Sequence, residues 1–321
     1  MRSSVHRASA IAATVALSLS MAACGGDDTA DTTGTTSTVQ PTEPTDPPPT
    51  DAPSITAPST TEAPVTQPPE TDPSPTTAPA AELLPVAVYF ALDERAAPVR
   101  RFVDPMSTGL LAGTFEAWLD GPTPQEQAAG YGTTVPAGTR LLNASYEDDL
   151  VVVDLSGEFA SGGGSAAVIF RLAELVMTAY SAVIIPDGVV LMIDGQVVEM
   201  FTGEGIVIDG PLTMDDVEAQ LPAIVQHSVL AGDEVSEGVQ IAGWANVFEA
   251  TVSVQVLDAG GALIHDSFTT ATCGTGCRGS FVTWLTFGGY TGPATLRLFE
   301  VSSMDGSDTN VVEFPITVVP A

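Results

Sequence analysis

Two cysteines in the C-terminal part of the chain, Cys273 and Cys277, form its most specific chemical motif. Only Gly-Thr-Gly separates them, and the two glycines permit the tight turn that closing so small a ring requires. A thioredoxin-like redox site has two residues between its thiols, and a structural zinc site needs four ligands. In an oxidising compartment the spacing therefore predicts a Cys273–Cys277 disulfide, with a redox site or a metal site as the alternatives.

Histidines and one oxygen-rich segment are the next candidates. His265 and Asp266 could be half of a catalytic triad, but adjacent residues of a strand point to opposite faces and no G-x-S-x-G motif accompanies them. His227, which also lies in a predicted strand, is expected to be a packed or surface residue rather than a ligand. Residues 305–310 could offer oxygens to Ca²⁺, but they lack the pattern of an EF-hand. We predict a hairpin turn there, with a cation site as the alternative.

Carboxylates elsewhere in the chain are scattered, and nothing in the sequence places any two of them together. A glycosidase-type pair therefore cannot be argued. Gly162–Gly164, ahead of a predicted helix, could receive an anion at the helix N-terminus, but no partner residues support such a site. We expect no catalytic residue, no metal and no cofactor. The carboxylates considered are Asp120, Asp154, Asp194, Glu204, Asp215 and Asp216.

The overall charge excludes several classes of function. The chain has 40 acidic and 9 basic residues, a formal net charge of −31, and no lysine at all. It therefore has neither the lysine of a nucleotide-binding P-loop nor a Schiff-base amine. Nucleic acid and an anionic bilayer would both be repelled by this surface. We expect the acidic residues to keep the surface solvated, with cation binding as the alternative.

The N-terminus has the three zones of an export signal. Arg2 and Arg7 precede a short apolar run, and Met21-Ala22-Ala23 places small residues before Cys24. This end resembles the lipobox of bacterial lipoproteins, with Met21 where leucine is usual. The resemblance implies cleavage before Cys24 and acylation of its thiol, so that two or three chains hold the protein to the membrane. The alternative is an ordinary secretory signal with an incidental cysteine.

Residues 24–81 are predicted to be a disordered tether. They consist mostly of Thr, Pro, Asp, Ser and Ala, and such a segment cannot bury enough apolar surface to offset the entropy of ordering it. As a random coil it would span about 40 Å, and fully extended on the order of 180 Å. That reach suits a domain held away from a membrane inside a cell wall.

Residues 83–202 are predicted to form an α+β domain. Apolar residues at helical spacing before Gly121-Pro122 indicate a first helix, and Ser165 is expected to cap a second. Segments on either side of Glu147-Asp148-Asp149 predict a hairpin. Strands and helices mixed in this way are typical of the α+β class. The predicted strands are 84–92, 98–103, 139–146, 150–155, 189–193 and 197–201, and the helices start near 110 and 165.

Four motif segments occur in order within this domain: 119–123 (LDGPT), 135–139 (VPAGT), 151–156 (VVVDLS) and 193–195 (IDG). Together they resemble the GerMN domain, named after sporulation and spore-germination proteins. The resemblance implies a role in envelope assembly and assigns no catalytic residue. Lipoproteins associated with sensor kinases also carry this domain. Some members of this family are related to modules that build rings. Only one copy of the domain is present here, which argues against a self-assembled ring.

The C-terminal segment is dense in strand signals. After a bridging stretch, in which Thr213 and Asp216 have capping-box spacing for a short helix ending before Pro222, about seven short strands follow at regular intervals. Val252, Val254 and Val256 alternate with polar residues, which is typical of a half-buried strand. Segments 243–250, 278–281 and 299–306 resemble the immunoglobulin-like domain of bacterial spore-germination proteins.

These observations predict a membrane-anchored extracytoplasmic lipoprotein that works as a non-enzymatic interaction or scaffolding module in envelope assembly or signalling. The alternatives are an extracytoplasmic wall-glycan hydrolase and an accessory regulator of a membrane sensor kinase. The expected partners are the lipid bilayer, through Cys24, and an envelope protein or wall polymer. The predicted domains are a signal peptide (1–23), a tether (24–81), a GerMN-like α+β domain (83–202), a bridging segment (203–221) and an all-β immunoglobulin-like sandwich (222–321).

Overall fold

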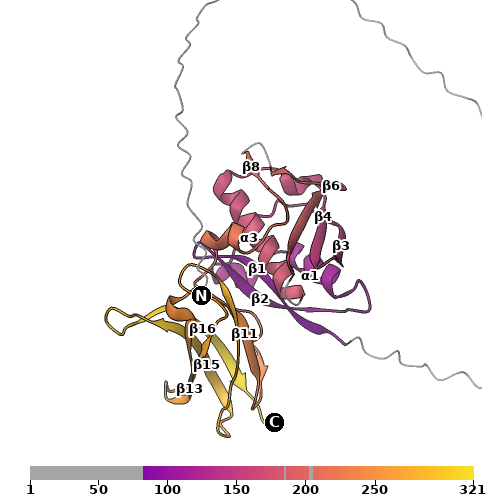
Figure 1. The fold of residues 1–321 in the computed structure, drawn as a ribbon. Coiled ribbons are helices and arrows are strands. Elements are labelled where there is room, and N and C mark those ends of the chain that lie inside the picture. Colours follow the sequence, from indigo (N-terminus) through magenta and orange to yellow (C-terminus); the bar gives the residue numbers. More distant parts are fainter. Residues whose placement is uncertain (1–81, 184–185, 202–204) are drawn as a thin grey trace, which may run out of the picture. The chain divides into compact units, whose positions relative to one another are not determined.

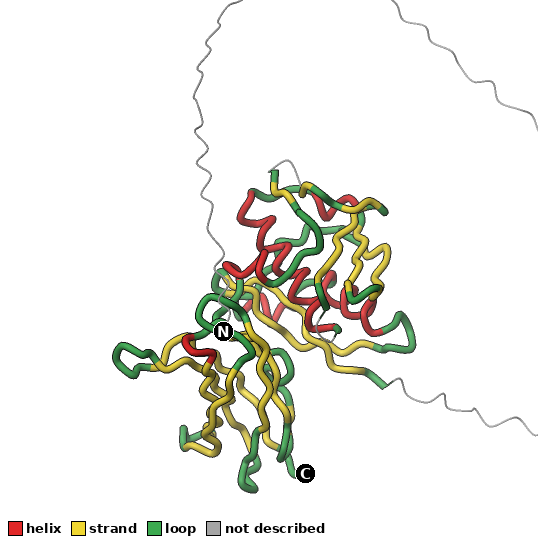
Figure 2. Tube along the Cα trace, viewed as in Figure 1, coloured by secondary structure: helices red, strands yellow, loops and turns green. Residues whose placement is uncertain are grey.

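The computed structural model of the protein describes residues 82–183, 186–201 and 205–321 (Figure 1). The predicted signal peptide, Cys24 and the tether lie outside these residues, as does Glu204. The described residues belong to one compact unit. Helices and strands are mixed in its first half, whereas strands predominate after residue 224 (Figure 2). This arrangement confirms the predicted order of an α+β domain followed by an all-β sandwich.

The α+β domain begins with a long antiparallel hairpin of β1 (Leu84–Leu92) and β2 (Arg95–Val103). Asp93 and Glu94 form its two-residue turn with φ values of 48° and 60°, a geometry that matches the twist of the strands. The central helix α3 (Ser165–Ala182) covers the outer edge of β1, where the Tyr89 amide donates to the Thr178 hydroxyl at 3.1 Å. Most of β1 is thus shielded from water, and this explains why the strand is apolar over most of its length.

A four-stranded sheet forms the rest of this domain, in the order β3-β4-β5-β6. The strands are β3 (Leu141–Glu147), β4 (Leu150–Leu155), β5 (Gly188–Ile193) and β6 (Gln196–Val197). Strands β3 and β4 pair antiparallel, as predicted, whereas β4 and β5 are parallel. Helix α3 supplies the long crossover that a parallel pair needs.

The helices follow the predicted spacing, with two corrections at element ends. Helix α1 spans Leu110–Leu119, and α2 (Pro124–Ala128) follows it. Ser165 is the first residue of α3 and Gly164 occupies the N-cap position, so the prediction that Ser165 caps this helix was wrong. The predicted strand 197–201 is also interrupted. The Val198 amide still bonds to β5, but Glu199 accepts from Ile208, which redirects β7 (Met200–Phe201) to β8 (Ile206–Val207).

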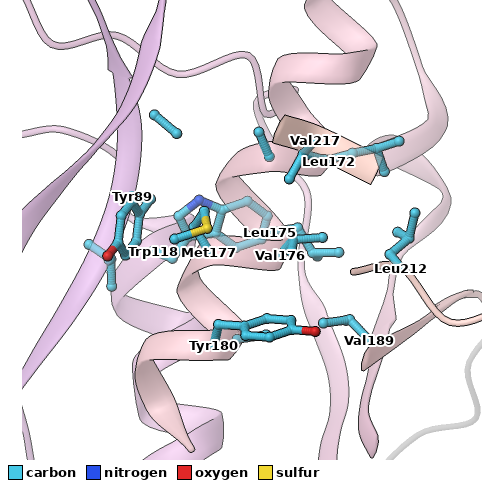
Figure 3. Packing of buried hydrophobic residues seen from close by; sticks show 14 of the residues in the cluster. Tyr89, Trp118, Leu172, Leu175, Val176, Met177, Tyr180, Val189, Leu212 and Val217 are labelled. Carbon is cyan, nitrogen blue, oxygen red and sulfur yellow. The ribbon is translucent and has the colours of Figure 1, made fainter. Parts of the chain in front are cut away.

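Helix α3 lies at the centre of the core (Figure 3). Its residues from Arg171 to Tyr180 are all buried, because β1 and β2 cover one side and α1, β5 and the bridging segment cover others. By length and composition α3 could cross a membrane, but 61% of it is buried within the domain, as in the core helix of a globular fold. Phe115, Trp118 and Phe159 pack edge to face beside it.

The bridging segment contains the predicted short helix as one 3₁₀ segment, η2 (Asp215–Gln220), which ends before Pro222. The Asp216 carboxylate accepts from the Thr213 amide and from the Thr213 hydroxyl, both at 2.8 Å. This is the carboxylate half of a capping box. Val217 points into the α+β core and is 1% exposed, so the segment is packed against that domain.

The sandwich has a five-stranded sheet, β10-β16-β15-β12-β13, and a three-stranded sheet, β14-β11-β9. Val252, Val254 and Val256 are fully buried between the sheets, which confirms the predicted alternation in β12. A short 3₁₀ turn, η3 (Phe248–Ala250), precedes β12. The strands are β9 (Ile224–Gln226), β10 (Glu234–Val235), β11 (Gln240–Ala245), β12 (Thr251–Asp258), β13 (Leu263–Thr270), β14 (Gly279–Trp284), β15 (Gly292–Val301) and β16 (Asp308–Val318).

The two domains share buried apolar residues. Val225, Leu230 and Trp244 of the sandwich belong to the same hydrophobic cluster as β1 and α3. The Trp244 ring meets that of Tyr180 edge to face, with 6.3 Å between their centroids. Because fully burying one such side chain stabilises a fold by about 1.5–3 kcal/mol, this shared cluster joins the domains firmly.

Candidate functional site

Two of the four motif segments come together around one pocket of the α+β domain. Residues 119–122, at the end of α1, and residues 135–139, which precede β3, line a pocket of about 360 Å³. Trp118, Gln127 and Thr133 complete its wall. We name this feature the motif pocket. Its lining combines apolar proline, valine and tryptophan surfaces with a few hydroxyl, amide and carboxylate groups, which is the mixture typical of a ligand-binding pocket.

The first loop of the motif pocket is fixed at both of its ends. Gly121, at φ 75°, ends α1 in a conformation that favours glycine. Thr123 and Glu126 then form a full capping box at the start of α2. Arg101 of β2 donates to both Glu126 oxygens at 2.7 Å and to the Gly121 carbonyl at 3.2 Å. These charge-assisted bonds hold the loop against the hairpin and keep the pocket open.

Glu174 of α3 holds the other side of the motif pocket from within the core. Its carboxylate accepts from the Thr133 hydroxyl at 2.6 Å, from the Thr134 amide at 3.0 Å and from the Thr134 hydroxyl at 3.2 Å. Burial raises the pKa of Glu174 to about 7, although these hydrogen bonds partly offset that effect. A buried carboxylate that titrates near neutrality therefore anchors the start of the second loop.

Arg171, one turn earlier on α3, forms hydrogen bonds to backbone carbonyls of several segments near the same loops. Its guanidinium donates to the carbonyls of Thr134 at 2.9 Å, Ser161 at 3.2 Å and Gly162 at 3.1 Å, and also to the Phe159 carbonyl. Its side chain is almost fully buried. The Gly162–Gly164 segment therefore offers a carbonyl oxygen, which accepts a hydrogen bond from Arg171. An anion site would instead present backbone N–H donors.

Sequence reasoning did not single out Arg171 or Glu174. The available signal was their position, since they are the two charged residues of α3 and are three residues apart beside its apolar face. Two charges on one side of an otherwise apolar helix indicate buried groups with specific partners, because an unpaired buried charge is very costly.

The aspartates of the remaining motif segments hold turns. Asp154 accepts from the Gly195 amide at 3.0 Å, and Asp194 accepts from the Gly157 amide at 3.2 Å. Ser156 accepts from the Arg140 amide at 2.9 Å through its hydroxyl. Each of these side chains thus satisfies a backbone donor at the end of a strand. The motif carboxylates Asp154 and Asp194 have structural roles, while Asp120 lies exposed at the rim of the motif pocket.

The rings of His265 and His227 contact hydroxyl, carbonyl and aromatic groups. Both ring nitrogens of His265 meet hydroxyl or carbonyl groups, at Thr286 and Ser267, while Asp266 accepts from Gln255 at 3.2 Å. His227 lies just after β9 rather than within a strand, because β9 ends at Gln226. Its ring stacks on Trp244 at 4.5 Å, and burial lowers the pKa of His227 to about 4. His227 is therefore a packed side chain whose ring is uncharged at neutral pH.

Residues 305–310 connect β15 to β16 and begin the second strand, as the turn prediction requires. Asp305 accepts from the Ser307 amide at 3.1 Å and from its hydroxyl at 2.7 Å, and these bonds lower the pKa of Asp305. Within the described ranges, no group of three or more His, Cys, Asp or Glu side chains is placed to hold a metal ion.

The cysteine loop lies at the edge of the sandwich, where Cys273 and Cys277 are joined with 5.8 Å between their Cα atoms. The Thr275 amide donates to the Val247 carbonyl, and the Gly276 amide donates to the Asn246 side chain. Asn246 in turn donates to Glu218 of η2 at 2.8 Å. The loop thereby positions a chain of contacts that leads from the sandwich to the bridging segment.

Arg278, the residue after this loop, completes that connection. It donates to both Glu218 oxygens, at 2.7 and 3.0 Å, and to the Pro222 carbonyl at 2.9 Å. Its side chain is 1% exposed, so the ion pair is shielded from water on the arginine side. The cysteine loop, Asn246 and Arg278 together fix η2 against the sandwich.

Replacing both cysteines with serine should lower the free energy of unfolding by only about 1–2 kcal/mol, because the ring that they close is very short. The local effect should be larger than the global one. Amide hydrogen exchange should speed up in residues 246–250 and 213–222, which the loop contacts directly or through Asn246. Unchanged exchange in both segments would show that the loop carries no such role.

Comparisons with known proteins match both domains. A family model described as "Sporulation and spore germination" (Germane) matches residues 87–199, and one described as "Immunoglobulin-like domain of bacterial spore germination" (Gmad2) matches residues 229–307. No curated protein matches this chain.

Two solved structures from Bacillus subtilis are also similar. One is the first GerMN domain of the sporulation protein GerM, with 17% identity, 41% of this chain and 98% of that chain covered, and a TM-score of 0.31. The other is the tandem GerMN domains of GerM, with 16% identity, 64% and 62% covered, and a TM-score of 0.33. The two family models alone lead to the conclusion that this chain carries a GerMN domain followed by an immunoglobulin-like domain of the bacterial spore-germination type.

Proposed function

We propose that the protein is a membrane-anchored, extracytoplasmic lipoprotein that acts as a non-enzymatic interaction module in the assembly or signalling of the cell envelope. The motif pocket is its candidate contact site on the GerMN domain. The observation that carries this proposal is how the motif residues are used. Asp154, Ser156 and Asp194 hold turns, and residues 119–122 and 135–139 shape a pocket. The most specific residues of the domain thus build a surface.

Membrane anchoring is proposed from the sequence of the leader. Arg2 and Arg7, the apolar run and the small residues before Cys24 support export, cleavage and acylation at that cysteine. An extracytoplasmic location also supports oxidation of Cys273 and Cys277, which are bonded in the structure. An acyl anchor at Cys24 would tether the two domains to the membrane through residues 24–81.

The anchor is tested by intact-mass measurement of the protein purified from membranes. We expect a mature chain that begins at Cys24, carries the mass of two or three acyl chains, and lacks two protons because of the Cys273–Cys277 bond. Cys24→Ser should move the protein from the membrane to the soluble fraction. A native chain that retains residues 1–23 or carries no acyl group would contradict the anchor.

The interaction role is tested with a variant that fills the motif pocket. Ala137 is exposed and lines this pocket, whereas Ala129 is exposed at the end of α2 and does not line it. Ala137→Gln should lower the recovery of cross-linked envelope partners by about tenfold, since a filled pocket excludes a docked side chain. The matched Ala129→Gln variant should recover them as the wild type does.

Two outcomes would overturn this proposal. If cross-linking recovers no envelope component from wild-type cells, the interaction role fails. If the purified protein instead releases soluble sugar from isolated wall material, the function is hydrolysis of wall glycan.

A further inference from the structure

A wide cavity lies where the β1–β2 hairpin meets the sandwich. It is an open cleft of about 690 Å³ between the end of the hairpin and the segment from Ser228 to Val239. Phe102 and Pro85 form the hairpin wall, and Phe102 is 61% exposed. Val239 and the short strand β10 lie on the opposite wall. We name it the junction cleft.

The junction cleft is preformed, because an ion pair and the shared core hold its two walls together. Arg100 of β2 donates to both oxygens of Asp233, and its guanidinium also donates to the Ser228 carbonyl at 2.9 Å. Both partners of this pair are mostly buried. A bidentate arginine–carboxylate pair fixes geometry as well as distance, so the walls need not rearrange when a ligand binds.

Two polar side chains of the junction cleft, Asp233 and Ser228, are already used internally. The Asp233 carboxylate accepts from Arg100 and also from the Leu230 amide at 2.8 Å. The Ser228 hydroxyl accepts from the Ala242 amide at 2.8 Å. A sugar, which needs many hydrogen-bond partners, would find these two side chains already engaged. The surface left for a ligand includes the apolar side chains of Pro85, Phe102 and Val239, with the exposed carboxylate of Glu234 beside them.

Charge then selects among apolar ligands. Among the described residues Glu234 has no ion-pair partner, while the one arginine of the cleft is committed to Asp233. The whole chain has a formal net charge of −31, so the field around the cleft favours a cationic ligand. A second copy of the chain would bring the same negative charge to the contact, which disfavours self-association through this face.

We propose that the junction cleft docks an extended segment of a partner protein that carries aliphatic side chains flanked by lysine or arginine. An aliphatic side chain packs between Phe102 and Val239, and a neighbouring basic side chain meets Glu234. This inference rests on the proposed function, because it names the chemistry of the protein partner. It adds to the motif pocket a second contact, at the junction of the two domains, which only a chain carrying both domains can form.

The proposal is tested first with defined probes on the full-length mature protein. A labelled peptide of lysine alternating with leucine and valine should bind, and fluorescence anisotropy should show weaker binding as salt rises. The same peptide with glutamate in place of lysine should not bind. Phe102→Ser should weaken binding of the lysine peptide by about tenfold, as loss of a central apolar contact does. Glu234→Gln should weaken it by about threefold, because a contact at the exposed rim contributes less.

Matched controls separate the cleft from general attraction to an acidic protein. Phe268 is 70% exposed on β13, away from the cleft lining, and Asp148 is an exposed acid of the β3–β4 turn. Phe268→Ser and Asp148→Asn remove the same groups elsewhere and should leave binding unchanged. Equal losses for the cleft variants and these controls, or no loss for Phe102→Ser, would overturn the proposal.

A cellular experiment identifies the occupant. A photo-cross-linking phenylalanine analogue at position 102 should give an adduct whose partner peptide contains aliphatic and basic residues, and the analogue at position 268 should not. An adduct with a second copy, an adduct with wall glycan, or no adduct at position 102 would each overturn the cleft proposal. If position 102 gives no adduct but the wild-type protein still recovers envelope partners, the cleft proposal fails while the proposed function is retained.

Discussion

Replacing Arg171 with methionine should lower the free energy of unfolding by about 3–5 kcal/mol, measured by urea denaturation followed by circular dichroism. The reason is that one buried guanidinium serves four backbone carbonyls, at Thr134, Phe159, Ser161 and Gly162. Methionine fills much of the volume but leaves these acceptors without their charged donor. Leaving a buried acceptor unsatisfied costs about 1–3 kcal/mol.

Two further variants sharpen this result. Arg171→Lys should recover little stability, because an ammonium is a point charge and cannot replace a planar fork that reaches several carbonyls. Arg140 supplies the control, since its side chain is 69% exposed and its nearest carboxylate oxygen, on Glu158, is 4.0 Å away. Arg140→Met should change the free energy of unfolding by about 0.5 kcal/mol or less. Similar losses for Arg171→Met and Arg140→Met would contradict the role assigned to the buried guanidinium.

Glu174→Gln should make the stability of the protein much less dependent on pH. In the folded protein burial raises the pKa of Glu174 to about 7, above the usual value of 4.5. The folded state therefore holds this proton more tightly than the unfolded chain does. The stability that results is fully present below about pH 4.5 and is lost as the pH rises through 7. Over this window the wild type should lose about 3 kcal/mol through this group.

The quantity to measure is the difference in free energy of unfolding between Glu174→Gln and wild type, from urea denaturation at several pH values between 4.5 and 8. As the pH rises, the variant should become more stable relative to the wild type, because only the wild type loses stability through the titration of Glu174. The amide satisfies Thr133 and Thr134 less well than the carboxylate does, but the amide does not titrate, so the pH dependence of the difference comes from Glu174 in the wild type. Glu116→Gln, an exposed carboxylate on α1, is the matched control and should show a flat difference. A flat difference for Glu174→Gln as well would show that this carboxylate does not titrate in the window.

The periodic parts of the fold could be predicted from local sequence. Val252, Val254 and Val256 alternate with polar residues because one face of β12 is buried and the other faces water. The residues of α1 repeat at helical spacing up to Gly121, where a positive φ ends the helix. In both cases a short stretch of chain carries the whole signal, so no knowledge of distant contacts is needed.

Element ends were predicted less well, because distant residues decide them. The predicted strand 197–201 is interrupted at Glu199, whose carbonyl accepts from Ile208, a residue beyond the following loop. Ser165 has the composition of a helix cap, but Gly164 takes that position. Local propensity does not separate these neighbours: the Gly164 backbone is still extended (φ −85°, ψ 175°), and Ser165 is already the first helical residue.

By itself, the sequence determined the two domain types, their order and the acidic surface, because motifs, periodicity and composition are local or additive properties of the chain. The tertiary structure alone decided that residues 119–122 and 135–139 share one pocket with Glu174 behind it. It also decided that Phe102 and Val239, more than a hundred residues apart in the chain, line one cleft. The physical reason is that both sites are made by packing between segments distant in sequence, and no spacing along the chain records such contacts.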